Sequence, residues 1–202
     1  MSNLSNQPLS PLDGRYQPAV AGLGEYLSEA GLNKARVHVE VEWLIHLANR
    51  NLLKNNAPLD LTEIDRLRNV VTNFSDDDVA TLAKTEAVTK HDVKAVEYFV
   101  REKLAEIGRS DLAELTHFAC TSEDINNLSY AVTVRESIAQ VWLPRAEILL
   151  AKLRELSAKY AEISMLSRTH GQPATPTTMG KELAVFVYRL ERQLTRIRNA
   201  EY

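Results

Sequence analysis

Hydrophobic residues recur every three or four positions over most of the chain. This spacing places them on one face of an α-helix, and such a face is buried against a neighbouring element. Only 7 glycines and 7 prolines occur in 202 residues, so we expect long helices and few turns. The pattern predicts an all-α fold with helices at residues 33–53, 61–74, from 75 onward, 93–107, 111–120, 123–160 and from 178 to the end.

The first 24 residues differ, because prolines and glycines break any periodicity. We expect an ordered loop in which Asp13 and Gly14 form a tight turn. The turn would present Arg15 and Tyr16 side by side. A guanidinium suits phosphate or carboxylate, and the phenol adds a hydroxyl donor. The alternative is a surface arginine beside a tyrosine packed on the fold, and these residues alone favour it.

Three predicted helices begin with a residue pair at the spacing of a capping box. A helix start also attracts anions, because its first N–H groups are unpaired and carry partial positive charge. At the third start, uncharged polar residues are too dense for capping alone and suit an oxygen-rich ligand. The pairs are Ser75 with Asp78, Thr89 with Asp92, and Thr121 with Asp124; the dense group is Thr121, Ser122, Asn126, Asn127 and Ser129.

Two further stretches carry titratable groups. An imidazole, a carboxylate and an ammonium gather at the first turn of the helix at 93–107, namely those of His91, Asp92 and Lys94. Capping by Thr89 and Asp92 is the simpler interpretation. Capping and a functional role for His91 can hold together. The other stretch, residues 167–178, has two prolines and a glycine, which predict an irregular backbone.

That irregular loop holds His170, which can transfer a proton near neutral pH. The simpler alternative is a structured turn in which His170 only bonds a backbone carbonyl. Thr177 or Thr178 is expected to cap the last helix. Within the helix at 123–160, Pro144 lacks an N–H group, so it should kink the helix or end it near Trp142.

Composition excludes several classes of protein. Lys and Arg number 24 against 27 Asp and Glu, a net charge of -3, so no overall basic surface indicates nucleic-acid binding. The single cysteine, Cys120, cannot form an internal disulfide and suits a reducing cytoplasm. Charges interrupt every long apolar run, which indicates no membrane span, and residues 1–11 lack the apolar core of a signal peptide.

Four motifs together resemble one family, the adenylosuccinate lyases of the bacterial type. Two of them mark the wider superfamily of fumarase, aspartase and argininosuccinate lyase, and the other two narrow the resemblance. The broad motifs lie at 118–127 (FACTSEDINN) and 167–175 (SRTHGQPAT), and the narrower ones at 10–16 (SPLDGRY) and 90–98 (KHDVKAVEY).

The resemblance implies an all-helical homotetramer in the cytoplasm. It implies an N-terminal helical domain at 1–110, followed at 111–202 by the first long helices of a central helical bundle. The implied reaction eliminates fumarate from adenylosuccinate, giving AMP, and from the succinocarboxamide ribotide of purine biosynthesis. The family needs no metal or organic cofactor, and its partners are the nucleotide substrate and further copies of the chain.

The resemblance also implies roles for individual residues. His170 would be the general acid that protonates the leaving nitrogen, with Thr169 beside it, and His91 would orient or charge-balance the substrate. The remaining residues would bind substrate: Arg15 and Tyr16 the phosphate, Thr121 and Ser122 the succinyl carboxylate, with Lys90, His91 and Asp92 lining the site.

Two features depart from the family pattern. Lys90 stands where many relatives carry Asn or another uncharged residue, which affects its contact but not the family. The family's general base is a serine on a glycine- and serine-rich loop, and no such loop occurs here. The last helix also shows no stop signal before residue 202. We therefore expect the N-terminal part of a longer protein, inactive as a lyase by itself.

Two other interpretations remain open. One is a sister lyase acting on argininosuccinate, aspartate or a cyclic acid. The other is a helical oligomerisation module without catalysis, in which the polar clusters are only caps. The near-heptad apolar stripe from Leu183 to Ile197 would then serve to bind partner helices.

Overall fold

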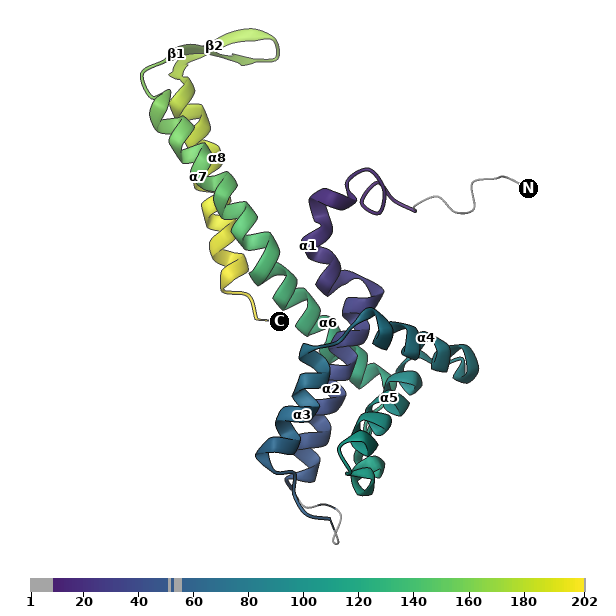
Figure 1. The fold of residues 1–202 in the computed structure, drawn as a ribbon. Helices are drawn as coiled ribbons and strands as arrows, with labels where there is room; N and C mark the ends of the chain where they lie inside the picture. Colours follow the sequence, from purple (N-terminus) through teal and green to yellow (C-terminus); the bar gives the residue numbers. More distant parts are fainter. Residues whose placement is uncertain (1–8, 51, 53–55, 202) are drawn as a thin grey trace, which may run out of the picture. The chain divides into compact units, whose positions relative to one another are not determined.

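The computed structural model describes residues 9–50, 52 and 56–201 (Figure 1). They form two compact units, Met1–Glu136 and Ser137–Tyr202, each of which is described by itself. The all-helical fold is confirmed apart from one small β-hairpin in the second unit. The predicted domain division at residues 110 and 111 stays a prediction. No helix in the described part of the chain is long and apolar enough to cross a membrane.

The first unit is a cluster of helices around α2 (Figure 1). Val37, Val41 and Leu44 of α2 are fully buried and belong to one core with Val96 and Val100 of α5. The elements are α1 (Gln17–Leu27), α2 (Glu29–Ala48), α3 (Leu61–Thr72), α4 (Asp76–Thr89), α5 (Asp92–Glu106), a 3-10 helix (Ser110–Leu115) and α6 (Ser122–Ser137).

The loop predicted over residues 1–24 is confirmed at 9–16, which form turns, and was wrong at 17–24, which are helical; residues 1–8 lie outside the described part. Helix α1 begins at Gln17, and Pro18 occupies its first turn, where a missing N–H costs no hydrogen bond. The next helix begins at Glu29 rather than Asn33, because the Ser28 hydroxyl accepts from the Gly31 N–H at 3.1 Å and caps it. It ends at Ala48, and Leu53, the predicted end, lies outside the described residues.

The short helix predicted at 111–120 is confirmed only in its first half. Only a 3-10 helix over Ser110–Leu115 forms. Beyond it, His117 and Ala119 both have φ of 60°, in the left-handed region that ends regular helices. Helices α3 and α4 match their predicted positions, and Ser75 and Asp78 form the predicted capping box.

The second unit is a pair of long helices joined by the hairpin (Figure 1). α7 and α8 lie side by side, with Leu150 of one and Leu194 of the other buried. Pro144 produces a π-helical segment, Ile138–Trp142, and the chain stays helical through it, so it does not end the helix. The elements that follow are α7 (Leu143–Lys159), β1 (Ser164–Thr169), β2 (Gln172–Thr178) and α8 (Met179–Arg198).

The irregular loop predicted at 167–178 is instead part of an antiparallel hairpin. Thr169 pairs with Gln172, which leaves His170 and Gly171 as a two-residue turn. Their φ angles are 50° and 75°, as a type I′ hairpin turn requires at both central positions. The predicted cap of the last helix is confirmed, since the Thr178 hydroxyl accepts from the Lys181 N–H at 3.2 Å.

Gly180 allows α8 to approach the end of α7. A Cβ atom at Gly180 would lie 2.7 Å from the backbone nitrogen of Ala161 and would also overlap the Ser157 carbonyl oxygen. Neither backbone atom can move without opening the helix pair. We expect Gly180→Ala to destabilise the second unit by about 2 kcal/mol or more. Urea unfolding followed by circular dichroism measures this, with Gly24→Ala as control because its added Cβ would meet open space.

Candidate active site

His91 is the N-cap of α5. Its ring nitrogen Nδ1 accepts a hydrogen bond from the Lys94 N–H at 3.2 Å. The predicted cap by Thr89 and Asp92 was therefore wrong. Lys90 takes a left-handed conformation, φ 55°, that ends α4 and turns the chain directly into α5. The Thr89 hydroxyl is engaged with the backbone of His91.

This cap determines which ring nitrogen of His91 is available. A backbone N–H only donates, so Nδ1 must be an acceptor and the neutral ring carries its proton on Nε2. The Nε2 atom lies 3.4 Å from the Ser122 hydroxyl oxygen, although the two residues are 31 positions apart. His91 and Ser122 belong to different motifs, and each was predicted to bind substrate. The structure brings their side chains together.

Ser122 and Thr121 stand at the start of α6. The Thr121 N–H and hydroxyl both donate to the Asp124 carboxylate, at 2.7 and 3.0 Å. The predicted capping box thus forms in part, because the Thr121 hydroxyl donates instead of accepting. These two bonds hold the pKa of Asp124 below its usual range. Ser122 remains directed at His91.

Asp92, another predicted substrate residue, is held within the fold. Its Oδ2 accepts from the Arg36 guanidinium at 2.6 Å, and its Oδ1 from the Val93 N–H at 2.8 Å. Burial alone would raise its pKa, but the Val93 hydrogen bond and the Arg36 charge lower it below its ordinary value. The carboxylate therefore fixes the first turn of α5, and its role in substrate binding stays a prediction.

The ionisation of Asp92 gives a test of this contact. A depressed folded-state pKa adds stability that is present above the unfolded value, about 3.9, and lost as the pH falls through the folded value. We expect Asp92→Asn to lower the urea midpoint at pH 7 and to converge with the unaltered chain in acid below pH 3.9. A difference between the two chains that stays constant from pH 7 to pH 3 would contradict the pairing.

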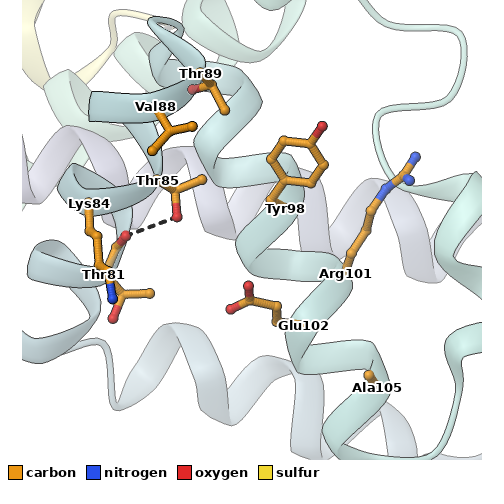
Figure 2. Close-up of a pocket in the computed structure, with 9 residues that line it drawn as sticks. All are labelled: Thr81, Lys84, Thr85, Val88, Thr89, Tyr98, Arg101, Glu102 and Ala105. Carbon is orange, nitrogen blue, oxygen red and sulfur yellow. Dashed lines mark hydrogen bonds between the residues drawn. The ribbon is translucent and has the colours of Figure 1, made fainter.

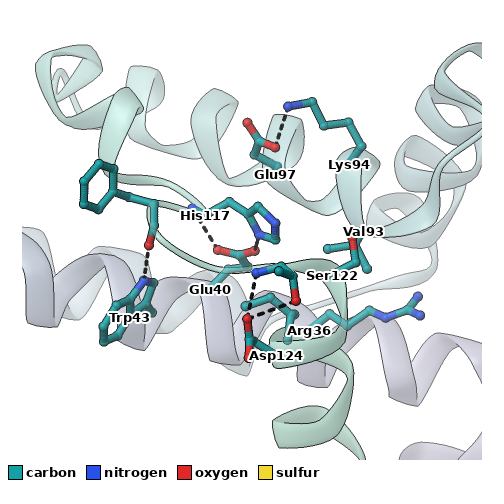
Figure 3. Close-up of polar contacts among 12 residues, drawn as sticks. Arg36, Glu40, Trp43, Val93, Lys94, Glu97, His117, Ser122 and Asp124 are labelled. Atoms are coloured by element: carbon teal, nitrogen blue, oxygen red, sulfur yellow. Dashed lines mark hydrogen bonds and ion pairs between the residues drawn. The ribbon is translucent and has the colours of Figure 1, made fainter.

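Sequence reasoning missed a buried hydrogen-bonded pair, Glu40 with His117, beside these residues. Glu40 of α2 is fully buried and accepts from the His117 N–H at 3.1 Å, with the ring Nδ1 at 2.6 Å (Figure 3). The Trp43 indole donates to the Phe118 carbonyl at 2.9 Å. Together they anchor the left-handed segment that leads into Thr121. The motif at 118–127 marked part of this segment, but nothing in the sequence indicated that Glu40 is buried against it.

The other predicted site residues are exposed, each on the surface of its own unit. Arg15 and Tyr16 are exposed at the start of α1, where the guanidinium stacks over the phenol ring at 5.6 Å. Lys90 is exposed at the junction before α5. Thr169 and His170 belong to the second unit, where His170 is exposed at the tip of the hairpin.

A groove of about 760 Å³ between α4 and α5 is a weaker candidate (Figure 2). Two of its threonine hydroxyls are already bonded to the backbone: Thr85 donates to the Thr81 carbonyl at 3.1 Å, and Thr81 to the Asp77 carbonyl. Its Arg101 is paired with the buried Glu97 at 3.0 Å. None of the predicted site residues lines this groove, so the His91–Ser122 pair remains the better site.

Comparison with known proteins identifies the family. The profile of a family described as lyase matches residues 14–202. The chain belongs to this lyase family. The resemblance read from the four motifs is confirmed by curated adenylosuccinate lyases, to which this lyase chain is similar over almost its whole length. That of Haemophilus influenzae is 47% identical over 194 residues and that of Escherichia coli K12 46%, covering 96% of this chain in both cases.

The match covers only part of those relatives. The chain spans 42% of the length of each of these two proteins. Among solved structures, the 3-carboxy-cis,cis-muconate lactonizing enzyme of Pseudomonas putida has a TM-score of 0.68 at 20% identity, over 90% of this lyase chain and 39% of that one. A fumarate lyase from Mesorhizobium has a TM-score of 0.68 at 18% identity, over 88% and 39%. These likenesses show a shared fold.

Proposed function

We propose that this chain supplies part of the active site of an adenylosuccinate lyase. The reaction eliminates fumarate from adenylosuccinate, giving AMP, and from the succinocarboxamide ribotide of purine biosynthesis. The observation that carries the proposal is the approach of His91 Nε2 to the Ser122 hydroxyl at the starts of α5 and α6. The similarity to curated adenylosuccinate lyases at 46–47% identity supports the choice of substrate.

The geometry suits the succinyl half of such a substrate. Removing a proton from the carbon next to a carboxylate builds negative charge on that carboxylate. The Ser122 hydroxyl, the first N–H groups of α6 and the His91 Nε2–H are donors for this charge, and the Thr121 hydroxyl joins them only if it leaves Asp124. The carbon–nitrogen bond then breaks, and His170 gives its proton to the leaving nitrogen as general acid.

The remaining predicted residues serve the nucleotide half. Arg15 provides a fork of N–H donors for the phosphate and Tyr16 a hydroxyl, while Lys90 and Asp92 line the substrate and Thr169 stands beside His170. The general base that removes the proton is none of these predicted site residues. The reaction needs no metal or organic cofactor, since a carboxylate neighbour and an imidazole acid suffice.

We further propose a cytoplasmic homotetramer, in which the open face of α8 contacts other copies. Phe186, Tyr188 and Leu190 on that helix are exposed, although Leu183 and Val187 are partly buried. An exposed apolar face of this kind is typical of an interface. The chain alone should then release no fumarate, because its site is incomplete without further residues.

A substrate panel tests the choice among lyases. The complete gene product should release fumarate from adenylosuccinate and from the succinocarboxamide ribotide, followed by ultraviolet absorbance, and not from argininosuccinate or aspartate. Release from argininosuccinate or aspartate instead would favour the sister lyases. A gene product that cleaves none of them would favour the oligomerisation module.

A further inference from the structure

A buried arginine joins the helices that carry the candidate site. Arg36 of α2 is only 6% exposed, and each of its three nitrogens donates to a different residue. Nη2 donates to Asp92 at 2.6 Å, Nε to the Asn126 side-chain oxygen at 2.9 Å, and Nη1 to that of Asn33 at 3.0 Å. Figure 3 draws Arg36 together with Ser122 of α6.

The two distant partners of Arg36 are neighbours of the site residues. Asp92 is the first residue of α5 and directly follows His91. Asn126 lies four positions after Ser122, one helical turn further along α6. A single planar guanidinium therefore fixes the start of α5 relative to the start of α6. The distance between His91 Nε2 and the Ser122 hydroxyl depends on that placement.

We propose that Arg36 is a positioning residue that holds His91 against Ser122. The role needs arginine, because a buried cation must satisfy several donors in fixed directions and only a guanidinium supplies a rigid fork. A lysine ammonium at this position could reach one acceptor but not all three. Arg36 touches no reacting atom in this account, and acts only through Asp92 and Asn126.

The first test uses activity, and this arm rests on the proposed function. In the complete gene product, Arg36→Met should lower kcat/KM for adenylosuccinate by about 10- to 100-fold, since small misplacements of reacting groups are costly. The kcat/KM of Arg36→Lys should fall between that of the unaltered protein and that of Arg36→Met. Arg68→Met is the matched control, because Arg68 also pairs with a carboxylate of α2, Glu42, at 2.7 Å, but on the surface. It should keep the original rate.

The second test is structural and does not depend on lyase activity. Nuclear Overhauser contacts between the His91 ring protons and the Ser122 β-protons should be present in this chain and in Arg68→Met, and lost in Arg36→Met. If Arg36→Met does not fold, Asn126→Ala removes one tie and should weaken the same contacts. Contacts that persist in a folded Arg36→Met or Asn126→Ala variant would overturn the proposal. An inactive gene product that shows the expected loss of contacts would overturn only the proposed function.

Discussion

Replacing His170 will lower fumarate release from adenylosuccinate by the complete gene product about 10²- to 10⁴-fold, the usual contribution of a general acid. The leaving nitrogen needs a proton as the carbon–nitrogen bond breaks. His170 is exposed at the tip of the β1–β2 hairpin, where no packing role competes with a chemical one. The measurement is kcat from the initial rate of fumarate release at saturating substrate.

The choice of variant matters because the His170 backbone has a φ of 50°. Asparagine tolerates this left-handed conformation better than alanine, so His170→Asn should remove the proton donor and keep the turn. His46→Ala is the control, since His46 is an exposed histidine of α2 that stacks on Trp43 and belongs to no proposed site. Full activity in His170→Asn and His170→Ala would show that this histidine is only a turn residue.

Removing the carboxylate of Glu40 will destabilise the first unit by about 3 kcal/mol. Glu40 is fully buried, and its loss leaves the Nδ1 and the backbone N–H of His117 without a partner inside the protein. It also leaves a cavity beside the core. The free energy of unfolding of Glu40→Ala, from urea titration, measures this cost.

Two comparisons isolate the buried pair. Burial raises the pKa of Glu40, while the His117 hydrogen bond opposes that rise. Because the ionised form is thus poorly tolerated, Glu40→Gln, which keeps an acceptor without the charge, should cost less than about 1.5 kcal/mol. Glu42→Ala, two positions along α2, removes a surface pair with Arg68 and should cost less than about 1 kcal/mol. Equal costs for Glu40→Ala and Glu42→Ala would contradict the importance of burial.

The sequence predicted those elements whose signals are local. Helix α4 begins where Ser75 and Asp78 form a capping box, and the bonds that define it lie within four residues. Helix α1 was missed because prolines and glycines suggested a loop, although a proline in the first turn is compatible with a helix. The hairpin was missed because β2 carries Pro173 and Pro176, and neither strand alternates apolar and polar residues. The sequence analysis did not recognise His170–Gly171 as a two-residue hairpin turn with left-handed backbone angles.

In the candidate site too, the individual residues were predicted from nearby sequence, but contacts between distant residues were not. His91 and Ser122 were each predicted from a motif, but their approach across 31 positions follows only from the packing of α5 against its neighbours. Arg36 and Glu40 were missed because single charged residues in a helical pattern usually face solvent. Both are buried because α2 lies at the centre of the first unit and has other helices around it.

The central claim is that His91 and Ser122 act as one unit on the substrate of a lyase. A double-mutant cycle on kcat/KM for adenylosuccinate, with His91→Gln, Ser122→Ala and the double variant of the complete gene product, tests it most directly. If the two side chains bind the same group, each single change should reduce kcat/KM and the double variant should lose little more, a coupling of about 1 kcal/mol or more. Strictly additive losses, or single variants with unchanged kcat/KM, would contradict the account.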